Sequence, residues 1–177
     1  KLYYNANASN KSHLIAYSPE GTNTAGQVEW TIDGTKDIII AKAVSGSKTD
    51  GQQMAPLSFK HLLTQLQFEV IGSEAAKATF GKIVSIKVKD ALTKPKMTFS
   101  DNEVTTLDWT NTTDKTNLSV RNQNDDQEIA NIDMPVTADA QNVGYLMLQP
   151  AESYTLLVAT DNVTEKEVTI TMTGAAT

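Results

Sequence analysis

Cysteine is absent from this chain of 177 residues, which excludes disulfide bonds, thiolate metal ligands and cysteine nucleophiles together. Histidine is nearly absent, because His13 and His61 stand alone and neither belongs to an HxH or HExxH pattern. Two isolated histidines without cysteine make a poor transition-metal site. We therefore expect no metal centre and no cofactor. We interpret His61 as a structural side chain, with a catalytic or ligand role as the less favoured alternative.

Basic residues are few and dispersed. Arg121 is the single arginine, the lysines are scattered, and the net charge is −6. Nucleic-acid binding needs clustered basic side chains that neutralise phosphate, so this class of partner is excluded. An acidic surface also has no attraction for anionic lipid. No apolar run approaches the ~20 residues that cross a bilayer, so we expect no membrane-spanning segment.

Catalytic patterns are missing too. A serine hydrolase needs its nucleophile on a sharp turn, and there is no GxSxG; the Ser-Gly-Ser at 45–47 lies in a flexible stretch. Acidic residues gather at Asp114, Asp125, Asp126, Glu128 and Asp133. They fit a weak calcium site or, as we prefer, a solvated acidic loop. Spacing alone leaves the paired carboxylates of a glycosidase open. We predict a protein that is not an enzyme, with no catalytic, cofactor-binding or metal-binding residues.

The residue types that recur are those of strands and turns, namely Thr, Val, Ile, Asn, Asp and Ser. Hydrophobic residues make up 40% of the chain, enough for a core. Strand patterns come about every ten residues with turn signals between them, which is typical of a sandwich. No interval carries a crossover helix, so a parallel βαβ architecture is not expected. We predict an all-β antiparallel sandwich of Greek-key type.

Alternation of apolar and polar residues predicts the individual strands. The segments are 14–17, 28–32, 38–44, 66–70, 84–88, 97–99, 104–109, 143–148, 154–159 and 168–172. Asp33-Gly34 is a hairpin-type turn signal, and residues 73–78 are the one helical patch. Residues 110–127 are so polar that we expect an exposed excursion with at most one edge strand.

One stretch stands out as a linker. Residues 46–56 are small and polar and contain glycine and proline. We place a boundary here, with one domain or its remnant at 1–45 and a second at 57–177.

The order of several weak motifs resembles the fimbrillin family of Bacteroidetes surface pilins, which includes major, minor and anchor fimbrillins. The central motif is 56–70, a Leu-x-Phe-x-His-x-Leu pattern followed by a strand in which Leu66, Phe68 and Val70 alternate with polar residues. The other segments are Leu-Ile-Ala-Tyr-Ser-Pro at 14–19, the apolar run 37–44, Asn-Ile-Asp-Met-Pro at 131–135 and Gly-Tyr-Leu-Met-Leu-Gln-Pro at 144–150.

The resemblance implies two β-sandwich domains of transthyretin-like topology and a non-enzymatic subunit or accessory protein of surface pili that supports adhesion. It also implies export as a lipoprotein to the outer membrane, and partners that are other pilin subunits. Assembly in the family removes an N-terminal strand by proteolysis, and a neighbour's strand fills the groove, which is β-strand addition. Against the family pattern, we expect 1–45 to be a remnant of the first domain and the second domain to lack its final strands. We therefore expect an unpaired groove.

Two other functions stay open. A carbohydrate-binding module of a surface lipoprotein would need solvent-facing aromatic rings, such as Trp109 or Tyr145; Trp30 alternates like a core residue. A glycosidase fragment would need two carboxylates facing each other across a cleft.

Overall fold

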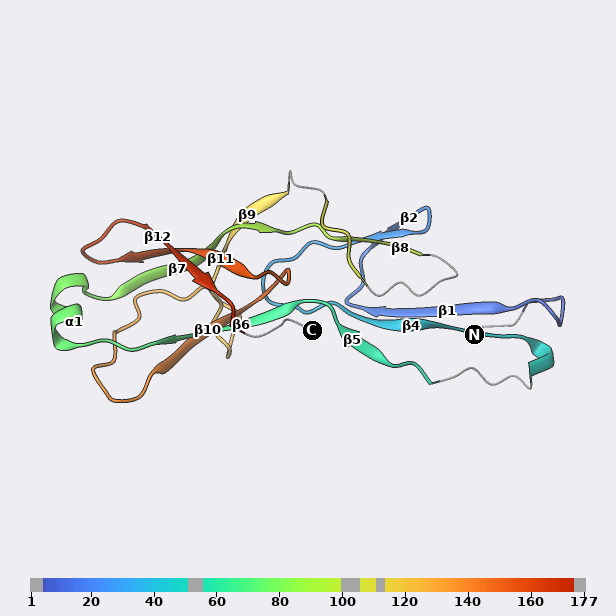
Figure 1. Cartoon of the computed structure of the whole chain (residues 1–177), viewed down its shortest axis with the longest axis horizontal. Helices are drawn as coiled ribbons and strands as arrows, with labels where there is room; N and C mark the ends of the chain where they lie inside the picture. The colour runs from blue at the N-terminus through green and yellow to red at the C-terminus, as the bar shows by residue number, and fades with distance from the viewer. Residues whose placement is uncertain (1–4, 51–55, 100–105, 111–113, 174–177) are drawn as a thin grey trace.

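The protein is an elongated molecule built from two layers of antiparallel strands, with a short helix at one end (Figure 1). The computed structural model describes residues 5–50, 56–99, 106–110 and 114–173. Its elements are β1 Ser12–Ser18, β2 Thr22–Thr24, β3 Gln27–Glu29, β4 Ile39–Gly46, the 3-10 turn Lys48–Asp50, β5 Phe59–His61, β6 Thr64–Val70, α1 Glu74–Phe80, β7 Ile83–Leu92, β8 Lys96–Thr98, β9 Lys115–Ser119, β10 Gln141–Leu148, β11 Ser153–Thr160 and β12 Lys166–Thr171. The predicted all-β antiparallel sandwich is confirmed.

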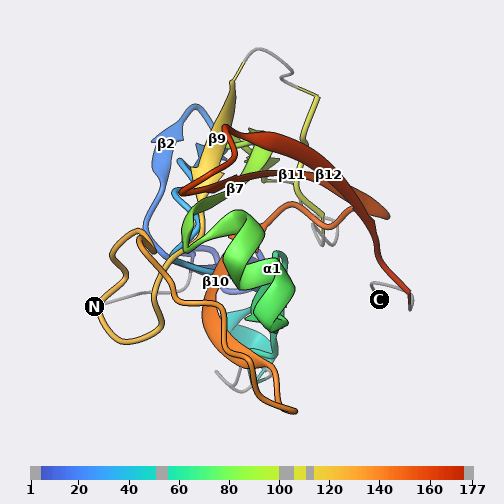
Figure 2. The same ribbon diagram turned by 90° about the vertical axis from the view of Figure 1, so that its left-hand side faces the viewer.

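Each layer consists of two sheets, one in each half of the molecule. In the first half, the three-stranded sheet β1-β4-β5 faces the three-stranded sheet β2-β3-β8 (Figure 1). In the second half, the four-stranded sheet β12-β11-β7-β9 faces the two-stranded sheet β10-β6, and α1 lies at the end of the molecule (Figure 2). The chain passes between the halves three times, from β5 to β6, from β7 to β8 and back from β8 to β9. These passes join the halves.

A single hydrophobic core runs through both halves. Val28, Ile38 and Met97 of the first half and Leu146 and Leu148 of the second belong to one cluster, and each is at most 2% exposed. Burial of a side chain of this size contributes about 1.5–3 kcal/mol. Since the sheets that meet in this cluster are made of strands distant in sequence, the core fixes the relative position of both layers.

The helical patch is confirmed as α1. Ser73 caps it, because its Oγ accepts a hydrogen bond from the Ala76 N–H at 3.1 Å. Gly81 ends it with a φ of 74°, a conformation that glycine adopts without strain. Residues 111–113 of the predicted polar excursion at 110–127 lie outside the described part; in the rest, β9 lies at the edge of the four-stranded sheet, as expected. Val120, directly after β9, is nevertheless fully buried.

The expected hairpin turn at Asp33-Gly34 is wrong. The hairpin joins β2 to β3, and its turn is Ala25-Gly26, with φ values of 50° and 81°. Gly34 also has a positive φ, of 89°, but it lies in the connection that leads to β4. A dipeptide that tolerates positive φ marks a tight bend, and the strand pairing decides which bend becomes the hairpin.

The predicted strand 28–32 is shorter than expected. β3 ends at Glu29, although Trp30 and Ile32 stay extended and buried. Their N–H groups donate to the carbonyls of Pro95 and Thr93, at 3.2 and 2.8 Å. The segment therefore lies against the connection between β7 and β8 rather than within a regular ladder. In the predicted strand 104–109, residues 104 and 105 lie outside the described part, and Asp108 makes only an isolated bridge with Lys96.

Val84 does not share the buried face predicted for 84–88. It is 37% exposed, while Ile83, Ile86 and Val88 are buried. The register between β7 and β11 shifts at this end, so that Ile83 rather than Val84 turns inward. The predicted domain boundary at 46–56 stays a prediction, as does the transthyretin-like topology; β4 and β5 on its two sides pair with each other.

Candidate functional site: the open side of the second half

The second half carries a row of apolar side chains that point inward but are not covered. Across the β11–β12 pair, Val168 is opposite Leu156, and Ile170 is opposite Tyr154. Directly opposed residues project from the same face of a sheet. Leu156 and Tyr154 are each 9% exposed and belong to the core, so Val168 also faces the interior. Val168 is nevertheless 46% exposed, and Met172, next in the alternation, is 38% exposed.

The facing strand on this flank is β6. Leu66 and Phe68 are buried in the core, whereas Gln65, Gln67 and Glu69 face solvent, as the sequence predicted. Among the described residues β6 pairs only with β10. Alternate residues of a strand direct their N–H and C=O groups to opposite edges. Within the described ranges, every second residue of β6 therefore has backbone groups without a partner strand at its other edge.

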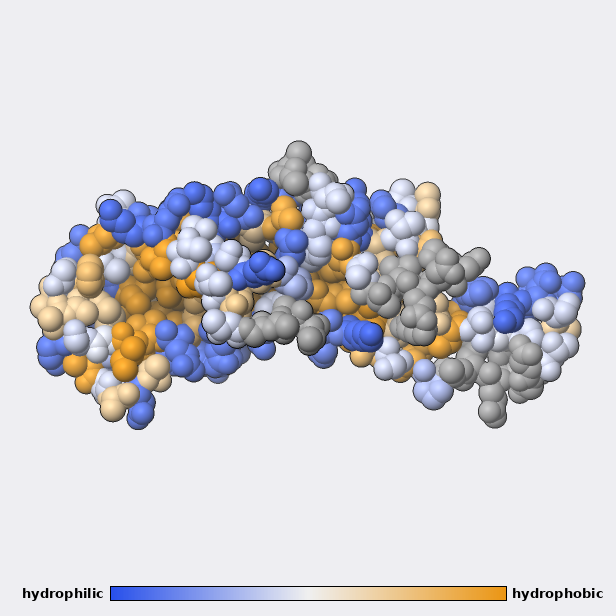
Figure 3. All heavy atoms as spheres, viewed as in Figure 1, coloured by the Kyte–Doolittle hydropathy of each residue, from blue (hydrophilic) through white to orange (hydrophobic). Residues whose placement is uncertain are grey.

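We call the flank between β6 and β12 the open side. Figure 3 shows it as a hollow in the second half with apolar residues at its base and hydrophilic residues along both rims. It arises because four strands on one layer face two on the other within the described residues. Among the described residues, the four-stranded sheet therefore extends at β12 beyond the edge of the two-stranded sheet that faces it.

The opposite face of the same sheet carries charged side chains that are partly exposed to solvent. Lys87 pairs with Glu165 at 3.3 Å, and Lys89 pairs with Glu167. Leu157 lies between these pairs in register and is only 5% exposed. The long side chains of lysine and glutamate cover apolar surface while their charges stay in water. The exposed apolar row of β12 is thus restricted to the inward face.

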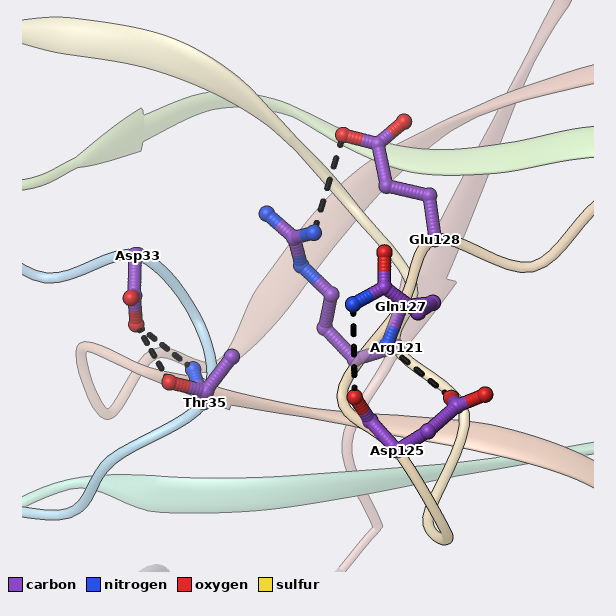
Figure 4. A network of polar contacts seen from close by, with 6 residues as sticks. All are labelled: Asp33, Thr35, Arg121, Asp125, Gln127 and Glu128. Atoms are coloured by element: carbon purple, nitrogen blue, oxygen red, sulfur yellow. Dashed lines mark hydrogen bonds and ion pairs between the residues drawn. The ribbon is translucent and has the colours of Figure 1, made fainter.

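A polar network joins the two halves near Arg121 (Figure 4). The Arg121 guanidinium points between Asp33 and Glu128, with Nη1 3.7 Å from a Glu128 carboxylate oxygen. Asp33 accepts hydrogen bonds from the N–H and hydroxyl of Thr35, at 2.9 and 2.7 Å. Burial opposes ionisation of Asp33, but the Thr35 hydrogen bonds and the charge of Arg121 outweigh it and lower the Asp33 pKa.

Tyr145 extends this network. Its hydroxyl lies 2.5 Å from a carboxylate oxygen of Asp126 and 3.3 Å from the Thr35 carbonyl. The hydrogen bond to Asp126, together with burial and the carboxylate charge, raises the pKa of Tyr145 to about 12. The network therefore links the loop before β4 to β10 by structural contacts, and the tyrosine stays protonated at neutral pH.

The acidic residues considered for calcium do not converge. Asp114 pairs with Lys94, Glu128 with Arg121 and Asp133 with Lys82. Asp126 contacts Tyr145, and Asp125 accepts from the Gln127 N–H. Across the described ranges, no group of three or more acidic, histidine or cysteine side chains could hold a metal ion. These contacts favour separate structural and surface roles.

His61 contacts Asp37, which agrees with its interpretation as a structural side chain. Its Nδ1 contacts a carboxylate oxygen of Asp37, while the side chain as a whole is 80% exposed. Asp37 is the less exposed partner, with 16% of its side chain exposed, and its other oxygen accepts a hydrogen bond from the Leu63 N–H at 3.2 Å. The pair connects Asp37, two residues before β4, to the end of β5 and the junction between β5 and β6.

Neither tryptophan offers a fully exposed ring as a platform for a sugar. Trp30 is 3% exposed, packs edge-on against Tyr17 with ring centroids 5.5 Å apart, and donates from Nε1 to the Pro19 carbonyl. Trp109 packs against the core and is half-buried. A hollow of about 710 Å³ near Trp30 is lined by charged and polar groups, including Glu20 and Lys36. Because the indole is covered, this hollow lacks the stacking surface that sugar-binding modules use.

The sequence predicted the strands that border the open side, but it did not predict that the open side lies between β6 and β12. The signal was present in 168–172, where three large apolar residues alternate on a strand. Whether they are covered depends on how many strands the opposite layer holds, which no local pattern states.

Comparison with curated proteins and with solved structures found no match. No helix in the part of the chain that the structure describes has the length and apolar character needed to span a bilayer. A family model described as fimbrillin-like matches residues 1–176. The match covers nearly the whole chain and agrees with the resemblance carried by the ordered motifs, and we conclude that this chain belongs to the fimbrillin-like family.

Proposed function

We propose that this protein is a non-enzymatic structural subunit or accessory protein of cell-surface fimbriae, and that it joins its neighbours by β-strand exchange. Membership of a structural pilin family supports the first part. The observation that carries the second part is the open side, where β6 has an unpaired edge beside the exposed row of β12.

Strand exchange fits the physical needs of this surface. An added strand forms backbone hydrogen bonds with the free edge, and its alternate side chains fill the apolar hollow. Unpaired edges with apolar neighbours otherwise cause uncontrolled association. A fimbrial subunit turns this property into a defined contact with one partner.

The proposal also includes location and role. The protein acts outside the cell in fimbriae associated with the outer membrane, after export as a lipoprotein precursor, and the assembled fimbriae support adhesion. The alternative of a carbohydrate-binding module has less support, because Trp30 is buried and Trp109 is half-buried against the core.

The test uses the protein from the cell that produces it. Surface material is sheared from the cells, purified through a tag on this protein, and analysed by native mass spectrometry, by gels run without heating, and by electron microscopy. We expect filaments and a ladder of subunits that resists mild denaturant. A monomer that never co-purifies with another subunit would overturn the proposal, and glycan binding by that monomer would establish the alternative.

A further inference from the structure

We propose that residues 33–36 form a clip that sets one fixed orientation between the two halves of the molecule. The clip is part of the connection from β3 to β4 in the first half, and it binds β10 in the second half. The shared core holds the halves together, and the clip decides the angle at which they meet. It acts within the single subunit, so its role does not depend on assembly into fimbriae.

The clip occupies the edge of β10 that faces away from β6. Alternate residues of a strand direct their N–H and C=O groups to opposite edges. On this edge Tyr145 and Arg121 exchange two backbone hydrogen bonds, of 2.8 and 3.0 Å. Two residues further along, the Met147 N–H donates to the Gly34 carbonyl at 2.8 Å. The row of backbone bonds along β10 therefore starts on a segment of the second half and ends on a segment of the first.

Glycine at position 34 permits this contact. Gly34 has a φ of 89°, which glycine adopts without strain. A Cβ at this position would lie 2.4 Å from Cδ2 of Leu146, a fully buried residue of β10. The backbone of the clip therefore packs directly on a core side chain of the other half. Such a close approach leaves little room for one half to slide past the other.

Side chains from both halves hold the clip in place. Within the clip, Asp33 accepts hydrogen bonds from the N–H and the hydroxyl of Thr35, which stabilise its bend (Figure 4). From the second half, the Tyr145 hydroxyl lies 3.3 Å from the Thr35 carbonyl and also contacts Asp126. The guanidinium of Arg121 adds an attractive charge near Asp33. Backbone and side-chain contacts thus both join the clip to the second half.

A directional contact of this kind is needed to keep one angle between the halves. The passes of the chain from one half to the other are potential hinges, because a few residues at the end of an element can absorb a change of angle. The core cluster that spans both halves is apolar, and apolar contacts have no preferred direction. Hydrogen bonds from the clip to β10 have a fixed length and direction, so they select one orientation.

A fixed angle matters in an elongated molecule. The two ends of the subunit lie far apart along its long axis, and the clip lies between them (Figure 1). A small rotation at the middle would therefore displace one end by a large distance relative to the other. With the clip in place, contacts made at the two ends keep a constant spacing and direction.

The test measures the distance between the halves in solution. The chain has no cysteine, so spin labels attach only at two introduced positions, His13→Cys on β1 and Thr169→Cys on β12. Both side chains are exposed, and the two strands belong to different halves. Pulsed electron spin resonance gives the distribution of distances between the labels. We expect a single narrow distribution when the clip is intact.

Two glycine variants form a matched pair. Gly34→Ala disrupts the clip, whereas Gly26→Ala adds the same methyl group at a similar φ where nothing lies within 4 Å. We expect Gly34→Ala to broaden the distance distribution at least about twofold and Gly26→Ala to leave it unchanged. Tyr145→Phe removes only the hydroxyl contacts, so it should broaden the distribution less than Gly34→Ala does.

Amide hydrogen exchange provides a second measurement at the clip itself. The Met147 amide donates to the clip, whereas Leu146 belongs to the pairing with β6. In Gly34→Ala, exchange at Met147 should become at least about tenfold faster while Leu146 stays protected. Asp33→Ala removes the hydrogen bonds inside the clip at an exposed position, and it should act in the same direction. It tests the clip even if Gly34→Ala does not fold.

Several outcomes would overturn the clip. One is a distance distribution that is already broad in the protein with an intact clip. Another is a distribution that stays narrow in Asp33→Ala and in folded Gly34→Ala, or that broadens equally in Gly26→Ala. Equal acceleration of exchange at Met147 and Leu146 would also contradict it, because that result indicates a general loss of stability rather than release of one contact.

Discussion

Val168 and Leu156 lie directly opposite each other on neighbouring strands and point to the same face, yet Val168 is 46% exposed and Leu156 only 9%. Chemically similar residues in the same sheet therefore contribute differently to stability. The difference comes from the opposite layer, which covers β11 but not β12.

The first prediction follows from this pair. Leu156→Ala should lower the free energy of unfolding by about 2–5 kcal/mol, because it leaves a cavity in the core. Val168→Ala should cost less than about 1 kcal/mol, because the side chain is already partly in water. Urea unfolding followed by circular dichroism measures both values. Equal losses for the two variants would mean that the open side is covered in the isolated protein.

The second prediction concerns two glycines with positive φ. Gly34 and Gly26 have φ values of 89° and 81°. A Cβ at Gly34 would overlap the Leu146 side chain, whereas at Gly26 nothing lies within 4 Å. Gly26→Ala should destabilise by about 1 kcal/mol through backbone strain alone. Gly34→Ala should lower the free energy of unfolding by about 1–3 kcal/mol more than Gly26→Ala does, because the added methyl group overpacks against a buried leucine. Thermal unfolding of both variants checks the order, which a larger loss for Gly26→Ala would contradict.

The third prediction concerns Asp37 and His61. Asp37→Ala removes the acceptor of the Leu63 N–H, and Leu63 is 7% exposed, so we expect a loss of about 1–3 kcal/mol. His61→Ala should cost less than about 1 kcal/mol, because the ring is 80% exposed in solvent. Chemical unfolding at neutral pH separates the two. A greater loss for His61→Ala would assign the imidazole a role beyond this contact.

The fourth prediction is a pH dependence. The folded-state pKa of Tyr145 is raised to about 12 from an ordinary value of 10.0. A raised pKa means that the folded protein holds the proton more tightly than the unfolded chain. The stabilising contribution is therefore complete below pH 10 and is lost as the pH rises towards 12. The stability difference between wild type and Tyr145→Phe should change over this interval.

Asp126 provides the control for that experiment. Its hydrogen bond to the hydroxyl is the largest cause of the raised Tyr145 pKa. In Asp126→Asn the pKa of Tyr145 should therefore fall towards 10, as an ultraviolet titration of tyrosinate can follow against the Tyr145→Phe protein. An unchanged pKa would show that Asp126 does not contact the hydroxyl in solution.

Much of the fold could be predicted from local patterns. The alternation of Leu66 and Phe68 with glutamines identified β6, and Ser73 with the alanines after it identified α1. These patterns succeed because side-chain periodicity and capping depend on near neighbours in sequence. Asp33-Gly34 and Val84 were misplaced because strand pairing and a register shift decide their roles, and both are set by distant segments.

The sequence predicted that the candidate site is an unpaired groove, but it did not predict where in the fold the groove lies. The family resemblance implied an unpaired groove, and the sequence showed the apolar row on β12. Its position depends on the mismatch between the four-stranded and two-stranded sheets, which arises from pairings between residues as far apart as Phe68 and Gly144. No window along the chain carries that information.

The passes of the chain from β5 to β6 and from β7 to β8 have a mechanical consequence. The strands run largely along the long axis of the molecule, and β5–β6 and β7–β8 continue this direction from one half into the other (Figure 1). Inter-strand hydrogen bonds lie across the strands. Tension applied along the axis therefore loads many of these bonds at once instead of peeling them apart in turn. The direction of the strands therefore favours resistance to a force that pulls along the long axis.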